Sequence, residues 1–501
     1  WALRARVRAG RELQETTLED AIQYTGMRLK ELSAGAEKGG VAVFVSPRMT
    51  NEEAYLAQKL ARVALRTHAI SSFANLLNPE LLCPEVVSTA SYDDLLGAQV
   101  IVLVGTRLEE DRFAADLLVK RAIRSGARVV YVGSDRDYVC KIAEVHLVCH
   151  PGAEAHALLA VSRKLLEFEG APLGDGPSEG LLRDAAALPF SALAAPAGVT
   201  EEEAAQVARV LHGSVARVVV FDKDARQVRT AGDERYLAAI ARALGAPFLA
   251  LRARANMQGL LDMGVHPAWL PGYLSAADPA ALVRLEREWC VALGDVQSST
   301  DDLAAALVDG RIRAAVVLGE DPLGNPDLPA PLGRALRELE FLVVGDLFLT
   351  PTAEAAHVFL PLSSPVETDG TFTNHERRIQ RVRRSIRPRN GLENWQLLCQ
   401  IAARVGSRFR MRYERIGDVW DEIRRVAPIY STALAQGHED GVIWDLDQFP
   451  LSPVAPPLSS LLAPGESARV HPTARAAFDA VERRFERRLT ALFERARAAL
   501  A

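Results

Sequence analysis

Short, continuously apolar segments alternate with helical segments along most of the chain. Residues 99–105 (QVIVLVG) and 127–133 (ARVVYVG) are apolar almost throughout, and a helical stretch over about 109–124 separates them. A strand that is apolar at every position is typical of a parallel sheet covered on both faces. The alternation therefore predicts an α/β fold with a doubly wound, mainly parallel sheet.

A second series of the same kind follows. We expect strands at 215–221, 247–251, 314–319, 340–346 and 355–362, with helices at 231–244 and near 330–338. An earlier strand, 41–46 (VAVFVS), precedes a helix that begins with the capping pair Thr50 and Glu53. Thr200 and Glu203 form the same pattern.

These patterns divide the chain into five predicted parts. Residues 1–90 form an N-terminal α/β part, and 91–170 form the first Rossmann-like unit. The Gly-, Pro- and Ala-rich residues 171–199 are a linker or excursion. Residues 200–410 form the second Rossmann-like unit, with a distinctive loop at 367–380. Residues 411–501 are a helical and Pro-rich extension that ends in one C-terminal helix.

Composition excludes several classes of protein. The 501 residues contain 59 Lys and Arg against 64 Asp and Glu, a formal charge of −5, which gives no support to nucleic-acid binding. Five Cys without any CxxC pair predict neither a disulfide framework nor a local cluster-binding motif, and we expect the reduced cytoplasm. The sequence has no signal segment and no apolar run long enough to span a membrane. It begins with Trp1, so we expect that the numbering starts inside a longer protein.

Small or acidic residues follow several predicted strands. The segments 102–111, 133–135, 317–326 and 345–346 combine Gly with Asp or Glu at a strand end. Ligands of doubly wound sheets bind at the carboxyl ends of the strands, where Gly lets a phosphate approach the backbone. A plain tight turn is the alternative, and no GxGxxG fingerprint is present.

Two long irregular segments are further candidates. In 367–391, Gly, Thr and Asn cluster between arginines, which suits either an anion-binding loop or a solvated loop before a basic strand. In 254–273, the polar candidates are Asn256, Gln258 and Asp262, and a structural crossover is the alternative. Cys83 is the one thiol in an irregular segment, although a free Cys is usually a small buried apolar residue.

Several stretches together resemble the molybdopterin oxidoreductase superfamily, above all formate dehydrogenase large subunits and the large Fe–S subunit of respiratory complex I, the NADH-quinone oxidoreductase. The stretches are SPRMTNEEAYLAQKLAR (46–62), NMQGLLDMGVHPAWLPGY (256–273), AEAAHVFLPLSSPVETDGTFTNHERRIQ (353–380) and the unit around GAQVIVLVG (97–105). The resemblance covers about residues 15–405. It implies two α/β domains that cradle a bis-pterin guanine dinucleotide with molybdenum or tungsten. The implied dinucleotide contacts are Gly105, Gly133, Asp135, Gly319, Asp321, Asp346, Thr371 and Asn374.

The chain also departs from this pattern. Cys83 is followed by Pro84 where the family's metal-binding Cys is followed by His, and Arg377 replaces a family Gly. The loop after Cys83 is short, and neither the family's cluster cysteines nor a C-terminal β-barrel is apparent. We therefore expect a vestigial pterin site, with no cofactor bound in residues 1–501 and no metal ligand.

The leading prediction is a non-catalytic scaffold subunit of an NADH-linked oxidoreductase. Its partners would be subunits that carry Fe–S clusters, flavin or NADH, with membrane contact through those partners alone. One alternative is an active formate dehydrogenase subunit in which Cys83 binds the metal, and Arg66 and His68 orient formate. The other alternative is a nucleotide-binding regulator, for which no phosphate-loop motif is present.

Overall fold

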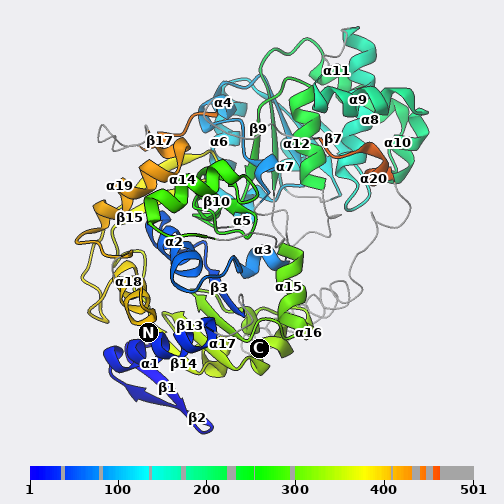
Figure 1. Cartoon of the computed structure of the whole chain (residues 1–501). Helices are drawn as coiled ribbons and strands as arrows, with labels where there is room; N and C mark the ends of the chain where they lie inside the picture. Colours follow the sequence, from blue (N-terminus) through cyan, green and yellow to red (C-terminus); the bar gives the residue numbers. More distant parts are fainter. Residues whose placement is uncertain are drawn as a thin grey trace, which may run out of the picture.

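Two mainly parallel sheets, each covered by helices on both faces, organise the computed structural model (Figure 1). The structure describes residues 1–34, 40–77, 83–134, 138–170, 176–222, 233–252, 254–293, 300–407, 410–431, 441–446 and 455–462. The predicted α/β class with parallel sheets is confirmed. The predicted C-terminal helix lies outside the described residues.

The first sheet has five parallel strands. Their order is β7 (Val145–Val148), β6 (Arg128–Gly133), β5 (Val100–Val104), β8 (Arg217–Asp222) and β9 (Phe248–Leu251). Alternate residues of β5 enter two different cores, Val102 on one face and Ile101 on the other. This two-sided burial is why the segment is apolar throughout.

Helices cover both faces of this sheet. One face packs against α8 (Glu154–Glu169), α9 (Pro177–Ala187), α10 (Phe190–Ala197), α11 (Glu201–Leu211), α12 (Asp233–Ala243) and α20 (Leu458–Leu462). The other face packs against α4 (Tyr92–Gly97), α5 (Leu108–Asp111), α6 (Phe113–Arg124) and α7 (Tyr138–Ile142).

The second sheet has seven strands. Their order is β2 (Glu12–Thr16), β1 (Ala5–Ala9), β14 (Val358–Pro361), β13 (Phe341–Asp346), β12 (Ala314–Leu318), β3 (Val41–Val45) and β4 (Ile70–Ser71). The five strands from β14 to β4 are parallel, whereas β1 pairs antiparallel with β14 and with β2. The β1–β2 hairpin projects from this part of the molecule (Figure 1).

This sheet is also covered on both faces. The helices around it are α1 (Leu18–Ser33), α2 (Asn51–Lys59), α3 (Phe73–Leu77), α13 (Met257–Asp262), α14 (Pro279–Trp289), α15 (Thr300–Val308), α16 (Ala330–Glu338), α17 (Pro351–Ala355), α18 (Asn394–Val405) and α19 (Ile416–Val426). Two small sheets complete the described part: β10 (Trp269–Leu270) with β11 (Leu274–Ser275), and β15 (Gly370–Thr373), β16 (Arg378–Val382) and β17 (Val442–Ile443).

The capping predictions are confirmed. The Thr50 hydroxyl accepts from the Glu53 N–H, and the Glu53 carboxylate accepts from the Thr50 N–H. Thr200 and Glu203 exchange the same pair of bonds at the start of α11. Such boxes satisfy N–H groups that have no partner within the helix.

Three predictions differ from the structure. Strands β8 and β9, assigned from sequence to the second unit, pair with β5 in the first sheet, because strand neighbours do not have to follow chain order. The segment 171–199, predicted as a linker or excursion, contains helices α9 and α10, which begin at or next to a proline and are rich in Ala. The β1–β2 hairpin was not predicted.

Among the described residues, no helix is both long and apolar enough to cross a membrane.

Candidate active site at two sheet crevices

Each sheet contains a point where the chain reverses its direction of winding. In the first sheet the chain runs outward from β5 to β6 and β7, and then returns to β8 on the other side of β5. In the second sheet β4 lies on one side of β3, and β12, β13 and β14 follow on the other side. A crevice opens at such a point outside the carboxyl ends of the strands, and ligands bind there. The strand order therefore predicts two ligand positions, one beyond β5 and β8 (called the first crevice) and one beyond β3 and β12 (called the second crevice).

The first crevice has a glycine turn and a buried ion pair. Gly105 follows β5 with a φ of 53°, in the left-handed region, and Thr106 is fully buried after it. Asp222 ends β8, and its carboxylate pairs with the Arg112 guanidinium at 2.7 Å. Both side chains are less than 10% exposed, at 7% and 6%. A pair removed from water in this way depends on close geometry for its net stability.

The second crevice has the same glycine turn and three carboxylates. Gly319 follows β12 with a φ of 69°, and a Cβ on it would lie 3.0 Å from the Ser46 Cβ. Glu320 accepts from the Ser72 hydroxyl at 2.6 Å and from the Phe73 N–H at 2.9 Å. Burial raises the pKa of Glu320 to about 7.

The other two carboxylates of this crevice stabilise loops. Asp321 accepts from the hydroxyl and the N–H of Thr352, at 2.6 and 3.0 Å. Asp346 accepts from the N–H groups of Leu347 and Phe348, and burial raises its pKa. Gly105, Gly319, Asp321 and Asp346 thus lie at carboxyl ends of strands, as predicted.

Two predicted residues remain, Gly133 and Asp135, and Gly133 lies at the end of β6, the neighbour of β5. Gly133 ends β6, where a Cβ would lie 3.0 Å from the Tyr131 ring. Asp135 lies outside the described residues.

The segments that carry the family resemblance meet in a buried polar network. The Asn51 amide donates to the hydroxyls of Thr371 and Thr373, at 3.0 Å each. The Thr373 N–H donates to the Asn256 side chain at 2.7 Å, and the Thr371 N–H donates to Glu52 at 2.8 Å. Residues far apart in sequence are thereby held together at buried positions.

Asp262 is the centre of a second part of this network. Its carboxylate accepts from Gln258 at 2.7 Å, Tyr273 at 2.5 Å, Tyr430 at 2.8 Å and Trp444 at 3.2 Å. Burial nevertheless raises the pKa of Asp262 to about 6, because the hydrogen bonds only partly offset desolvation.

The loop between β15 and β16 reaches the first sheet. The Tyr92 N–H, at the start of α4, donates to Glu376 at 2.8 Å, and the Tyr92 hydroxyl contacts the His375 ring. Arg377 has a φ of 68°, donates to the Ser88 carbonyl, and stacks over the Trp444 ring with its Cζ 5.4 Å from the ring centroid. Burial, with a smaller effect of Arg112, lowers the pKa of His375 to about 4.

Asn374 shapes this loop rather than an open surface. Its side-chain oxygen accepts from the N–H groups of Glu376 and Arg378, at 3.0 Å each.

Cys83 lies beside two arginines that sequence reasoning did not assign. Its thiol donates to the Glu85 carboxylate at 2.7 Å. Arg242 donates to the Glu85 carbonyl and Arg252 donates to the Val86 carbonyl at 3.4 Å, so both reach the backbone within three residues of Cys83, and Arg252 is only 3% exposed. Arg252 directly follows β9, so the rule that picks out residues at the carboxyl ends of strands would have found it.

Arg66 and His68 lie elsewhere. They precede β4 at the amino ends of the parallel strands, on the edge of the sheet opposite the second crevice. Arg66 donates to the Ala292 carbonyl, and the His68 Nε2 lies 3.1 Å from the Leu293 carbonyl. Burial lowers the pKa of His68 to about 4. The side chains that contact the backbone next to Cys83 are instead those of Arg242 and Arg252, which donate to the Glu85 and Val86 carbonyls.

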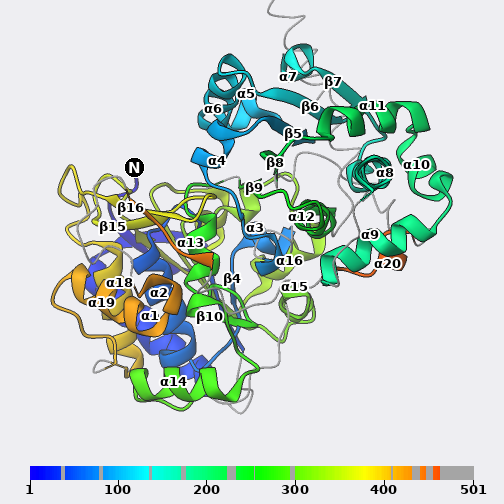
Figure 2. The same ribbon diagram turned by 90° about the horizontal axis from the view of Figure 1, so that it is seen from above.

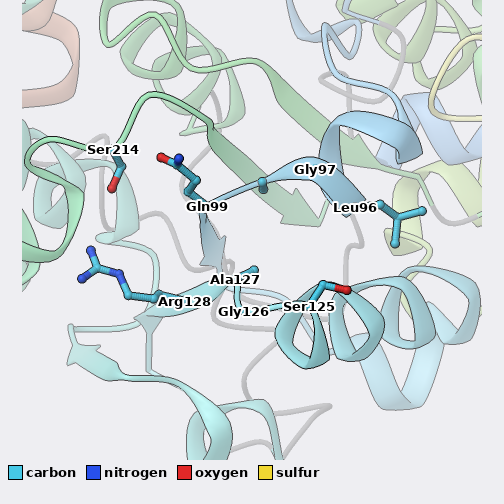
Figure 3. A pocket seen from close by; sticks show the side chains of 9 residues that line it. Leu96, Gly97, Gln99, Ser125, Gly126, Ala127, Arg128 and Ser214 are labelled. Carbon is cyan, nitrogen blue, oxygen red and sulfur yellow. The ribbon is translucent and has the colours of Figure 1, made fainter.

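One cavity lies far from both crevices. It has a volume of about 420 Å³ and lies at the amino ends of β5, β6 and β8, where Gln99, Arg128 and Ser214 contribute side chains (Figure 3). Ligands of doubly wound sheets bind at the opposite edge. In the part of the chain that the structure describes, no group of three or more His, Cys, Asp or Glu is arranged to hold a metal ion.

Comparison with known proteins points to one family. A family model described as molybdopterin oxidoreductase matches residues 193–404. The chain is 29% identical to F420-dependent formate dehydrogenase 2 subunit alpha of Methanococcus maripaludis, over 84% of this chain and 64% of that protein. It is 25% identical to formate dehydrogenase H of Escherichia coli, over 84% of this chain and 61% of that protein.

A solved structure has a similar fold. Acetylene hydratase from Pelobacter acetylenicus superposes with a TM-score of 0.63 at 15% identity, and the match covers 84% of this chain and 63% of that one. The chain thus spans less than two thirds of the length of these proteins.

Proposed function

Because the chain belongs to the molybdopterin oxidoreductase superfamily, we propose that it forms the cofactor-binding part of a formate dehydrogenase. The observation that carries this proposal is the Cys83 thiol at the start of the Pro84–Val86 turn, where the Val86 carbonyl accepts from the buried Arg252 guanidinium at 3.4 Å. A thiolate ligand next to a fixed cation suits a metal centre that oxidises a small anion. The relatives named as formate dehydrogenases favour this reading over the predicted scaffold.

The residues of the two crevices fit a pterin dinucleotide with molybdenum or tungsten. Gly105 and Gly319 expose backbone in the left-handed region, where a phosphate can approach closely. Among the described residues, the buried Thr106 hydroxyl and the Arg377 Nε have no hydrogen-bond partner. Buried polar groups are normally paired, so a bound group that supplies acceptors would satisfy both.

We divide the predicted dinucleotide contacts by their position in the fold. Gly105, Gly133, Gly319, Asp321 and Asp346 remain proposed contacts, because they lie at carboxyl ends of strands.

Thr371 and Asn374 are proposed to position the β15–β16 hairpin instead. Their polar atoms are engaged by Asn51, Glu52, Glu376 and Arg378. In this proposal they fix the position of the hairpin and do not contact the dinucleotide.

The side chains around Cys83 suggest how formate would be handled. A bound molybdenum or tungsten centre would supply the two-electron oxidant that the conversion of formate to CO₂ and a proton requires. Arg252 would hold the formate carboxylate by charge-assisted hydrogen bonds, and the Asp262 carboxylate would stabilise its positive charge. Glu85 accepts the thiol hydrogen bond of Cys83 and would take its proton when the thiolate binds metal.

A second candidate keeps the predicted scaffold of an NADH-linked complex, with subunits that carry Fe–S clusters, flavin or NADH as partners. Arg377 favours it, since a long cation stands where the family has Gly and stacks on Trp444. The buried Arg112–Asp222 pair also occupies polar groups of the first crevice. In this reading the chain binds neither molybdenum nor tungsten.

The deciding experiment measures formate-dependent activity in two cysteine variants. We would purify the native complex with Cys83→Ser and, as a matched control, with Cys290→Ser, whose thiol is exposed. The proposal expects formate-dependent dye reduction that Cys83→Ser abolishes and Cys290→Ser preserves. Equal formate-dependent rates in wild type and both variants would refute the role of Cys83.

A further inference from the structure

A basic segment follows the β15–β16 loop and is not used by the proposed site. Six arginines lie in the segment from Arg378 to Arg389, and no Asp or Glu occurs from residue 377 to residue 392. The whole chain has a formal charge of −5. A concentrated positive segment on an acidic chain gives a local field that can steer a partner of opposite charge.

Hydrogen bonds hold this segment in a fixed shape. The N–H groups of Ser385 and Ile386 donate to the Val366 carbonyl, at 2.9 and 3.1 Å. The Arg389 N–H donates to the Glu367 carboxylate at 2.9 Å, and Glu367 is buried. The arginines are therefore presented from a defined backbone, which lowers the entropy that a partner must remove on binding.

Only part of the positive charge is neutralised locally. Arg378 pairs with Glu376 at 2.7 Å, and Arg384 pairs with Glu393 at 2.6 Å. Within the described residues, the exposed side chains of Arg381, Arg387 and Arg389 form no ion pair. Three guanidiniums are thus available to carboxylates of another molecule.

Exposed apolar side chains lie among these cations. Val366 is 50% exposed, Ile386 is 42% exposed and Trp1 is 48% exposed. The Arg389 Cζ lies 4.4 Å from the centroid of the Trp1 ring. The N-terminus lies beside the yellow loops of this region in both views (Figures 1 and 2). Arginine and tryptophan dominate the binding energy of many protein interfaces.

We propose that this arginine surface, formed by Arg381, Arg387, Arg389, Val366 and Ile386, docks the acidic face of a ferredoxin-type electron-transfer protein. The inference rests on the proposed function, since formate oxidation releases two electrons that another protein must accept. Formate and two oxidised ferredoxins give CO₂, one proton and two reduced ferredoxins. The apolar residues and the net negative charge of the chain favour a protein over a nucleic acid as the partner.

The arginine surface is structurally connected to the candidate site. Strand β16 begins at Arg378, next to Arg377, which contacts Trp444 and Ser88. The same strand ends at Val382 and leads into the exposed arginines. A partner docked there would bind one end of the hairpin whose other end contacts the first sheet.

The test measures binding of a small acidic two-iron ferredoxin to the purified complex by titration calorimetry at 50 mM and 300 mM salt. We expect binding that weakens at least tenfold at the higher salt, since exposed charges are screened. The variant R381E/R387E/R389E is expected to weaken binding at least tenfold at 50 mM salt, and the triple Gln variant by less. Dye-linked formate oxidation should persist in both, which shows that they fold.

The matched control, R121E/R124E/R334E, reverses three exposed arginines on α6 and α16 and should bind ferredoxin as the wild type does. The proposal is overturned if wild type fails to bind ferredoxin, or if R381E/R387E/R389E binds it equally well. It is also overturned if R381E/R387E/R389E keeps ferredoxin binding and loses a binding of wild type to a DNA duplex or to phosphatidylserine vesicles. If wild type binds ferredoxin and R381E/R387E/R389E does not, but neither protein oxidises formate, the docking surface is supported and only the proposed function is refuted.

Discussion

The substitution Glu320→Gln removes a buried carboxylate from the second crevice while keeping its size. Burial raises the pKa of Glu320 from 4.5 to about 7. At a pH between these two pKa values, the Glu320 carboxyl is mostly ionised in the unfolded chain and mostly protonated in the folded chain. The free energy of unfolding therefore falls as the pH rises. At 1.36 kcal/mol per pKa unit, the group costs the wild type about 3 kcal/mol of stability by pH 8 compared with pH 4.5.

The assay compares chemical unfolding of wild type and Glu320→Gln at pH 4.5 and at pH 8. Other buried carboxyls such as Glu52, whose pKa burial also raises to about 7, are present in both proteins and cancel in the difference. We expect Glu320→Gln to gain about 3 kcal/mol relative to wild type across this range. The control Glu338→Gln, at an exposed position on α16, should show no such gain. The reasoning is refuted if the unfolding free energies of wild type and Glu320→Gln differ by the same amount at pH 4.5 and at pH 8.

Three further substitutions test the site. Gly319→Ala should lower the unfolding free energy by about 1–2 kcal/mol, because its φ of 69° disfavours a Cβ and Ser46 lies 3.0 Å away; an unchanged denaturation midpoint would contradict this. Thr373→Val should cost about 1–3 kcal/mol, because it leaves buried partners without their hydrogen bond, and the same unfolding assay measures it. Arg252→Lys should lower kcat/KM for formate at least tenfold, whereas Arg66→Lys should not; equal losses in steady-state assays would count against the revised assignment.

The sequence predicted the fold well where packing is local or repeated. Strands such as Val100–Val104 are apolar throughout because both faces are buried, and caps such as Thr50 with Glu53 are encoded within four residues. The partner of a strand is a different matter. Whether β8 joins β5 or β12 depends on which side of the sheet the chain returns to, and no short-range pattern encodes that.

The candidate site was predicted in part. The strand-end glycines Gly105 and Gly319 do lie at the two crevices, since the carboxyl-end rule needs only the strand positions. The grouping of Arg66 and His68 with Cys83 did not follow from sequence, because short separation along the chain says little about which sheet edge a residue occupies. Arg252 directly follows β9 and could have been found by the carboxyl-end rule, but its separation of 169 residues from Cys83 gives no sequence signal that the two lie near each other.

Elemental analysis of the native complex tests the central claim most directly. Molybdenum, tungsten and iron would be counted per copy of this chain by mass spectrometry, alongside the fluorescence of oxidised pterin released on denaturation. The proposed function predicts close to one molybdenum or tungsten per chain, together with pterin. Iron without molybdenum, tungsten or pterin would contradict it and favour the scaffold.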